Sequence, residues 1–281
     1  MNNAFLFPGQ GSQFVGMGKQ LYENFTFCKN IYDLANDILD YDIMEICFYD
    51  PNKLLNQTKY TQPSILIINF IIDTILKAYK IYPSINAGHS LGEFSALISS
   101  GVISFEDALK IIKIRSEAMQ NSEKTRPGSM IAVIGATQNQ IDDICNQNGV
   151  IVAANYNSKE QIVLSGDKKS ISAGIETAKS LGLKKIFQLN VSGAFHSPLM
   201  NSANKPLRNI INKTSFKDAE IPIIQNYKTI PLTDSRQIKE NLINQLENPV
   251  LWYQTINKIY NSQISNFYEV GPGKVLSNLT K

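Results

Sequence analysis

Short apolar runs alternate with segments of helical spacing along the first half of the chain. An apolar run that stops at a proline and a glycine is typical of a buried strand, whereas apolar residues three and four positions apart are typical of a helix. The pattern predicts a strand over 4–7, a helix opened by Gln62 and Pro63 that covers 64–76, a strand over 85–87, a helix over 93–99 and a helix from Ser104 to about Gln120.

The pattern changes from about residue 128, where strands become more frequent and helices shorter. The predicted elements are strands over 130–134, 150–153, 161–164 and 185–189 and helices over 138–146 and 169–181. Their order, β-α-β-β-α-β, is that of a small ferredoxin-like domain. The chain then returns to helices and short strands, and a strand over 267–270 is the last one that we expect.

The two patterns together predict an α/β protein with two parts. Residues 1–127 and 196–281 are expected to form a large domain around a parallel sheet, and residues 128–195 a small α+β subdomain inserted into it. A cleft between two such parts is the usual place for a ligand.

The composition is that of an ordinary folded protein. Of the 281 residues, 43% are hydrophobic and 18% are charged. The net charge of +3 is small and the lysines are scattered, so we expect no nucleic-acid partner, although a modest basic patch for an acidic partner is compatible with this charge. The N-terminus lacks the basic start of a signal peptide, and the apolar run at 64–76 is too short to span a bilayer. We therefore expect no membrane contact.

Cysteine usage bears on location and on metal binding. The three cysteines are far apart and form no CxxC pair, so we expect neither a disulfide framework nor a metal site, and a cytoplasmic monomer is the simplest expectation. No glycine-rich nucleotide loop is present either, because Gly9-Gln10-Gly11 does not continue as GxGxxG. No cofactor is expected.

The clearest chemical motif is the G-x-S-x-G sequence at 88–92. In such a motif a sharp turn between a strand and a helix exposes the serine, here Ser90, and the flanking glycines allow neighbouring backbone to approach closely. The start of the following helix directs free N–H groups at the same point, which suits an oxyanion. Taken alone, the motif fits an ordinary strand–helix turn equally well.

A serine nucleophile needs a base, and the chain has only two histidines. His89 adjoins Ser90, so its side chain should leave the turn in another direction. His196 follows the last strand of the insert and should face the cleft. A histidine at a domain junction is more often structural than catalytic, but a serine exposed at a sharp strand–helix turn, called an elbow, makes the catalytic role the better interpretation. Serine before histidine is also the chain order in α/β-hydrolases. No aspartate stands out as a third member, which leaves a backbone carbonyl or an amide to orient the imidazole.

Arg115 is conspicuous because only four of the 27 basic residues are arginines. Its helical spacing places it on the same face as Ala108, Ile111, Ile112 and Met119, which is apolar. A guanidinium there keeps its charge and must find an anion. Snorkelling to the surface or an internal ion pair is the usual solution, and a substrate that carries a free carboxylate is the alternative.

At this point the sequence resembles a known family over almost its whole length. The chain is similar to malonyl-CoA:acyl carrier protein transacylases and to the stand-alone acyltransferases that serve modular polyketide synthases in trans. The motifs that carry the resemblance are FPGQGSQ at 7–13, YTQP at 60–63, GHSLGE at 88–93, IRSEAMQ at 114–120, NYNSKEQIVLSG at 155–166, VSGAFHS at 191–197, QLENPVLW at 245–252 and EVGPGKVL at 269–276.

The resemblance implies a fold and a set of roles. The large domain should be α/β-hydrolase-like and the insert ferredoxin-like. Ser90 should be the nucleophile and His196 the general base and acid, oriented by the backbone carbonyl of Gln245. The oxyanion hole should consist of Gln10 and the backbone N–H of Leu91.

The remaining implied roles concern the acyl group. Arg115 should hold the malonyl carboxylate, Gln62 should line the pocket, and Phe195 should narrow the space for a 2-methyl branch. Ser116 departs from the glycine that is more usual after the arginine.

The resemblance implies ping-pong transfer of a malonyl group from malonyl-CoA, through an acyl-Ser90 intermediate, to the phosphopantetheine thiol of an acyl carrier protein. Two alternatives are an acyl hydrolase that clears carrier proteins, for which a buried Arg115 has no use, and a non-catalytic docking module, against which the intact Ser90, His196 and Gln10 argue. Between fatty acid and polyketide synthesis, the short segment after Gly-Pro-Gly-Lys-Val-Leu favours the trans-acting polyketide type.

Overall fold

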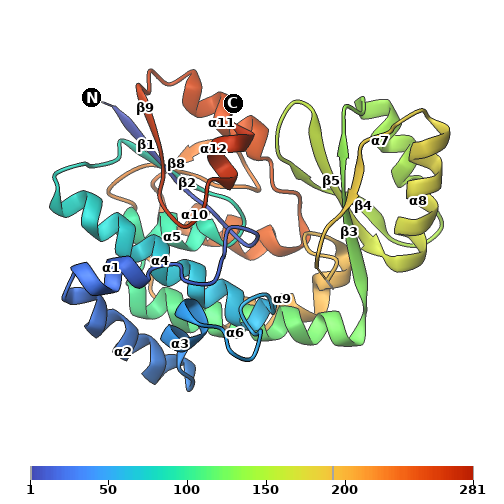
Figure 1. Ribbon diagram of the computed structural model, residues 1–281. Helices are drawn as coiled ribbons and strands as arrows, with labels where there is room; N and C mark the ends of the chain where they lie inside the picture. Colours follow the sequence, from blue (N-terminus) through green and yellow to red (C-terminus); the bar gives the residue numbers. More distant parts are fainter. Residues whose placement is uncertain (1, 192, 281) are drawn as a thin grey trace.

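A five-stranded sheet forms the centre of the larger part of the molecule (Figure 1). The computed structural model describes residues 2–191 and 193–280. The strands of this sheet are β1 (Asn3–Phe7), β2 (Ile85–Gly88), β7 (Ile223–Ile224), β8 (Pro231–Leu232) and β9 (Asn266–Glu269), in the order β8-β7-β2-β1-β9. The pairs among β7, β2, β1 and β9 are parallel, as the sequence predicts, and the short edge strand β8 is antiparallel to β7.

Helices cover both faces of this sheet (Figure 1), and every residue of its central strands β1 and β2 is buried. On β1, Phe5 and Phe7 point into the main core, whereas Ala4 and Leu6 point into a second core on the opposite face, which also holds the fully buried Trp252. A strand buried on both faces reads as a continuous apolar run, as residues 4–7 do.

Helices make up most of the large part outside its sheet. In chain order they are α1 (Lys19–Asn24), α2 (Phe27–Leu39), α3 (Ile43–Phe48), α4 (Thr58–Ala78), α5 (Gly92–Ser99), α6 (Phe105–Thr125), α9 (Asn201–Lys213), α10 (Ser235–Asn244), α11 (Trp252–Tyr260) and α12 (Val275–Leu279), with short 3-10 helices η1 (Pro198–Met200) and η2 (Gln245–Glu247).

Helix α4 begins one turn earlier than the sequence indicates, at Thr58, so that Pro63 lies inside it. A proline at this place removes the N–H that would bond the carbonyl of Lys59. Two hydroxyls replace that donor, since the Lys59 carbonyl accepts hydrogen bonds from Tyr41 Oη and Ser116 Oγ, both at 3.3 Å. The expectation that Gln62 and Pro63 open the helix was wrong because this compensation comes from residues distant in the chain.

Helix α6 starts as predicted, with the Ser104 hydroxyl accepting from the N–H of Asp107, but it extends to Thr125 rather than ending near Gln120. Its additional turn is held by tertiary contacts. Ser122 Oγ donates to the carbonyl of Leu199 at 3.0 Å, which ties the helix end to the segment before α9. Polar residues that look like a helix end in sequence are therefore packed against a neighbour.

The smaller part is a four-stranded antiparallel sheet with two helices packed on it (Figure 1). It contains β3 (Gly128–Ile134), α7 (Gln138–Cys145), β4 (Ile151–Tyr156), β5 (Gln161–Asp167), α8 (Lys168–Ser180) and β6 (Ile186–Gln188), and the sheet order is β4-β5-β3-β6. All six predicted elements of the insert are present, in the predicted order, and the four strands share one antiparallel sheet.

The two parts are joined along the end of β4. A bulge between Ala153 and Asn155 frees this strand from strict pairing with β5. The N–H of Val250, just before α11, donates to the carbonyl of Ala154 at 2.8 Å, and the N–H of Tyr156 donates back to the carbonyl of Val250 at 2.9 Å. Backbone hydrogen bonds from the small sheet to the large part thus fix the walls of the cleft between them.

Candidate active site

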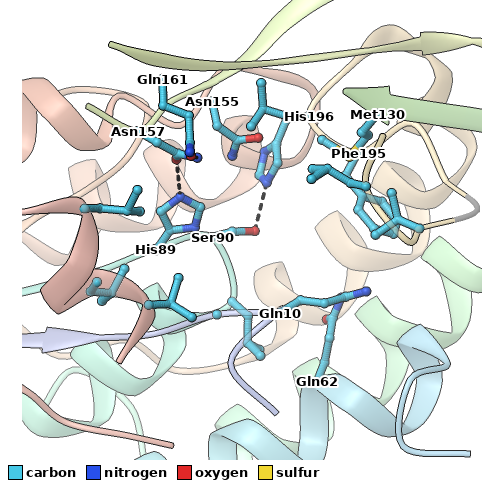
Figure 2. A pocket seen from close by; sticks show the side chains of 18 of the residues that line it. Gln10, Gln62, His89, Ser90, Met130, Asn155, Asn157, Gln161, Phe195 and His196 are labelled. Atoms are coloured by element: carbon cyan, nitrogen blue, oxygen red, sulfur yellow. Dashed lines mark hydrogen bonds between the residues drawn. The ribbon is translucent and has the colours of Figure 1, made fainter. Parts of the chain in front are cut away.

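A cavity of about 390 Å³ lies between the two parts and contains most of the residues singled out from the sequence. Its lining from the large part includes Gln10, Gln62, Ser90, Leu91 and Arg115. On the other side, Phe195 and His196 come from the segment that leaves the small sheet (Figure 2). The cleft predicted between the two parts is therefore present, and the candidate residues converge on it.

Ser90 lies at the turn between β2 and α5 with φ 51°, a left-handed conformation that few non-glycine residues adopt. The turn is possible because a β-carbon at Gly88 would lie 2.0 Å from the carbonyl of Gly92, and one at Gly92 would lie 2.0 Å from the carbonyl oxygen of Phe7. The side chain of Asn226 holds the turn, since its Oδ1 accepts from the Ser90 N–H and its Nδ2 donates to the Gly88 carbonyl, both at 2.7 Å.

The Ser90 hydroxyl lies 2.8 Å from Nε2 of His196 (Figure 2). On the opposite side of the imidazole, Nδ1 lies 3.1 Å from the carbonyl of Gln245 and 3.2 Å from that of Asn248. Carbonyl oxygens only accept hydrogen bonds, so Nδ1 carries the proton and Nε2 is left as the acceptor for the serine. This tautomer is the one that a general base requires.

Electrostatics keep His196 neutral. Burial, and then the positive charge of Arg115, lower the pKa of His196 to about 3. The imidazole is therefore unprotonated at Nε2 at neutral pH. His89, the other histidine, has a different environment, because its Nε2 pairs with Asn157 Oδ1 at 2.9 Å (Figure 2). Its ring also packs edge-on against Trp252.

Arg115 is only 1% exposed, so it does not reach solvent by snorkelling. Its Nη1 donates to Gln62 Oε1 at 2.6 Å, and its Nη2 to Ser90 Oγ at 3.2 Å and Gln245 Oε1 at 3.1 Å. Among residues 2–191 and 193–280, no carboxylate oxygen lies within ion-pair distance of it, and Nε is buried without a hydrogen-bond partner. A buried cation that faces a cavity with neutral partners is suited to binding an anion.

Glu93 is an acidic residue of this polar cluster whose charge acts on Arg115, and it was not identified from the sequence. The side-chain amide of Gln245 donates to Glu93 Oε2 and to the Ser90 carbonyl, each at 2.8 Å, while its oxygen accepts from Arg115. The other carboxylate oxygen of Glu93 accepts from the N–H of Asn226. Gln245 thus contacts His196 through its backbone and Arg115, Ser90 and Glu93 through its side chain.

The remaining candidates also line the cavity. Gln10, whose Nε2 lies 3.5 Å from Thr58 Oγ1, lines the same cavity as Ser90 (Figure 2). Leu91 is the N-cap residue of α5 and also lines the cavity. Phe195 is 7% exposed and forms part of the wall. Ser192, within the motif at 191–197, lies outside the described residues.

Three residues of the site were not identified from the sequence. Glu93 and Asn248 belong to the quoted motifs at 88–93 and 245–252, so the signal was available but no physical role pointed to them. Asn226 lies in no motif, and only its complete burial beside the elbow shows that it matters.

Within the described part of the chain, no group of three or more histidine, cysteine, aspartate or glutamate side chains is placed to bind a metal ion. The same residues include no helix that is long and apolar enough to cross a membrane.

A serine at a strand–helix elbow, paired with a histidine that carbonyl oxygens orient, defines a nucleophilic acyl-transfer site. Comparison with known proteins agrees, because the model of the acyl transferase domain family matches residues 4–281. The chain belongs to this family.

Individual relatives are more specific. The chain is 39% identical over 282 aligned residues to the malonyl CoA-acyl carrier protein transacylase of Bacillus subtilis, with 99% of this chain and 89% of that protein covered. The structure of the malonyl CoA-acyl carrier protein transacylase from Coxiella burnetii superimposes with a TM-score of 0.96 at 34% identity, covering 100% and 90% of the two chains. A malonyl-transacylase in complex with a type II polyketide synthase acyl-carrier protein gives a TM-score of 0.96 at 33% identity, covering 100% and 92%.

Proposed function

We propose that this protein transfers a malonyl group from malonyl-CoA to the phosphopantetheine thiol of an acyl carrier protein. The observation that carries the proposal is the hydrogen-bonded pair of Ser90 and His196 next to Arg115, a buried cation without a carboxylate partner among the described residues. The names of the relatives support the same substrate and acceptor.

The geometry suggests the order of events. Ser90 Oγ attacks the thioester carbonyl while its proton passes to Nε2 of His196, and the oxyanion of the tetrahedral intermediate is stabilised by Gln10 and the N–H of Leu91. The C–S bond then breaks, and the CoA sulfur takes the proton from His196. This leaves malonyl-Ser90, which the thiol of the carrier protein attacks by the same steps in reverse.

Arg115 would pair with the free carboxylate of the malonyl group, and Gln62, which accepts from Nη1, would hold the guanidinium in place. Phe195, in the cavity wall, would limit the space beside the α-carbon of the acyl group. We place the boundaries of the small subdomain at residues 128 and 195, so that it forms one wall of the cleft, and we propose a cytoplasmic, monomeric enzyme.

The acceptor provides the direct test of this function. With malonyl-CoA and excess carrier protein bearing phosphopantetheine, we expect malonyl transfer to the carrier protein to be much faster than release of free malonate. Mass spectrometry of the carrier protein and an assay for malonate measure the two products. Faster transfer to water would contradict the proposal and identify an acyl hydrolase.

The pathway is tested with the same assay. The trans-acting polyketide type would transfer malonyl faster to carrier domains of modular polyketide synthases than to a fatty acid synthesis carrier protein. The relatives include a transacylase bound to a polyketide carrier protein, and they do not favour the trans-acting modular type over fatty acid synthesis. The ratio of the two kcat/KM values decides.

The pH dependence of acylation follows from the low pKa of His196. An ordinary histidine becomes protonated below about pH 6.5 and stops acting as a base. Because burial and Arg115 lower the pKa of His196 to about 3, we expect kcat/KM for acylation by malonyl-CoA to stay nearly constant between pH 7 and pH 5. Stopped-flow measurement of CoA release at each pH checks this, and a loss of rate centred near pH 6.5 would contradict it.

A further inference from the structure

Glu93 is a buried carboxyl that lies in the site but takes part in no step of the proposed transfer reaction. It is 1% exposed and follows Ser90 by three residues on the first turn of α5. Both of its oxygens accept hydrogen bonds, from the N–H of Asn226 and from the side chain of Gln245. A carboxyl buried this deeply is costly, so its retention beside a reacting centre calls for a physical reason.

The side chain of Gln245 separates Glu93 from Arg115. Its amide nitrogen faces the carboxyl at 2.8 Å and its oxygen faces the guanidinium at 3.1 Å. If Glu93 formed a direct ion pair with Arg115, it would occupy the N–H donors of the guanidinium. A substrate carboxylate would then have to displace Glu93 in order to bind. An amide between the two charges keeps them coupled while the guanidinium remains available to the cavity.

We propose that Glu93 is a specificity-tuning residue, which acts through the side chain of Gln245 to set how strongly Arg115 attracts the free carboxylate of the acyl group. The inference rests on the proposed function, since it requires an acidic acyl substrate. When Glu93 is ionised, it competes with the substrate for the charge of Arg115. When Glu93 is protonated, the substrate carboxylate becomes the nearest anion to the guanidinium.

The charge state of Glu93 changes in an accessible pH range. Burial raises the pKa of Glu93 to about 8, although the hydrogen bonds from Asn226 and Gln245 and the charge of Arg115 favour the ionised form. Burial also lowers the pKa of Arg115 to about 10, and the charge of Glu93 acts in the opposite direction. The pKa of each group therefore depends on the charge of the other. The other contacts of Glu93 come from amides, including Gln225, which do not titrate.

Two further titratable groups lie near this cluster, His196 and His89. Burial lowers the pKa of both, so they stay neutral between pH 7 and pH 9. A change in substrate preference over that range therefore reports Glu93 rather than the histidines.

The experiment measures kcat/KM for acylation by malonyl-CoA and by acetyl-CoA between pH 7 and pH 9. Taking the ratio cancels effects common to both substrates, such as those on Ser90 or on the leaving thiol. We expect the malonyl-to-acetyl ratio of the unaltered protein to fall by about tenfold across this range, the factor that corresponds to a coupling of one pKa unit. In Glu93→Gln the ratio should stay at the high value of pH 7 throughout.

The control is Asp73→Asn, which neutralises another buried carboxyl, bonded by Lys77 and Ser99 and outside the cavity lining. This variant should keep the pH-dependent ratio of the unaltered protein. If Glu93→Gln lowers both rates together and leaves the pH dependence unchanged, Glu93 is structural and the inference is wrong. Should the variant fail to fold, a flat ratio in the unaltered protein alone has the same meaning.

The outcomes separate the inference from the proposed function. An unaltered protein that prefers malonyl-CoA, but whose ratio does not change with pH, contradicts the role of Glu93 only. An unaltered protein with no preference for malonyl-CoA at any pH contradicts both.

Discussion

Incubation of the protein with malonyl-CoA, without a carrier protein, is expected to add one malonyl group, and Ser90→Ala should abolish the addition. The reason is that Ser90, the proposed nucleophile, lines the cavity and its Oγ lies 2.8 Å from Nε2 of His196. Intact-protein mass spectrometry detects the adduct, and peptide mapping locates it. An equally stable adduct on the Ala variant would exclude Ser90.

His196→Ala should slow acylation by roughly 10⁴-fold to 10⁶-fold, because a nucleophile and its base act as one unit. His89→Gln is the matched control, since it replaces the other histidine with an amide that can still bond Asn157. We expect it to lose far less activity. Equal losses in the two variants would mean that the effect comes from packing around the elbow rather than from proton transfer.

The second large effect is expected at Arg115. Arg115→Ala should lower kcat/KM for malonyl transfer by about thirtyfold to several thousandfold, since truncating one partner of a charge-assisted pair in a desolvated pocket costs about 2–5 kcal/mol. Acetyl-CoA has no free carboxylate, so acetyl transfer should hold steady or rise. Arg115→Lys should recover only part of the malonyl rate, because an ammonium cannot reproduce the two parallel N–H donors.

The control for this prediction is Arg208→Ala, which removes an exposed arginine on α9 and should leave both activities unchanged. The decisive quantity is the malonyl-to-acetyl ratio on protein whose melting temperature shows that it is folded. A structural arginine would lower both activities and the melting temperature together. An unchanged ratio would remove Arg115 from the acyl-binding site.

Local sequence determined much of this protein. The run at 4–7 became a strand buried on both faces because adjacent apolar residues supply both cores. The six elements of the insert followed from a change of hydrophobic period that needs no long-range information. The elbow was also local, because Gly88 and Gly92 are the residues whose lack of a β-carbon permits it.

Contacts between distant residues were decided by the tertiary structure. Pro63 stays inside α4 because hydroxyls from Tyr41 and Ser116 bond the carbonyl that it leaves without a donor. Asn226 lies 136 residues beyond Ser90 and belongs to no motif, yet its side chain accepts a hydrogen bond from the Ser90 N–H and holds the elbow. Hydrophobic period reports which face of an element is buried, but it does not say which polar groups meet there.

The electrostatic coupling of Glu93 to Arg115 is the clearest feature that only the tertiary structure decided. The sequence showed a cation on an apolar helix face and a glutamate after the elbow serine, and neither local pattern indicates that the two groups meet. Packing of α5, α6 and η2 brings Glu93 and Arg115 to opposite ends of the Gln245 amide and removes water from all three. Burial gives these groups their shifted pKa values, and burial is a property of the assembled core rather than of the chain.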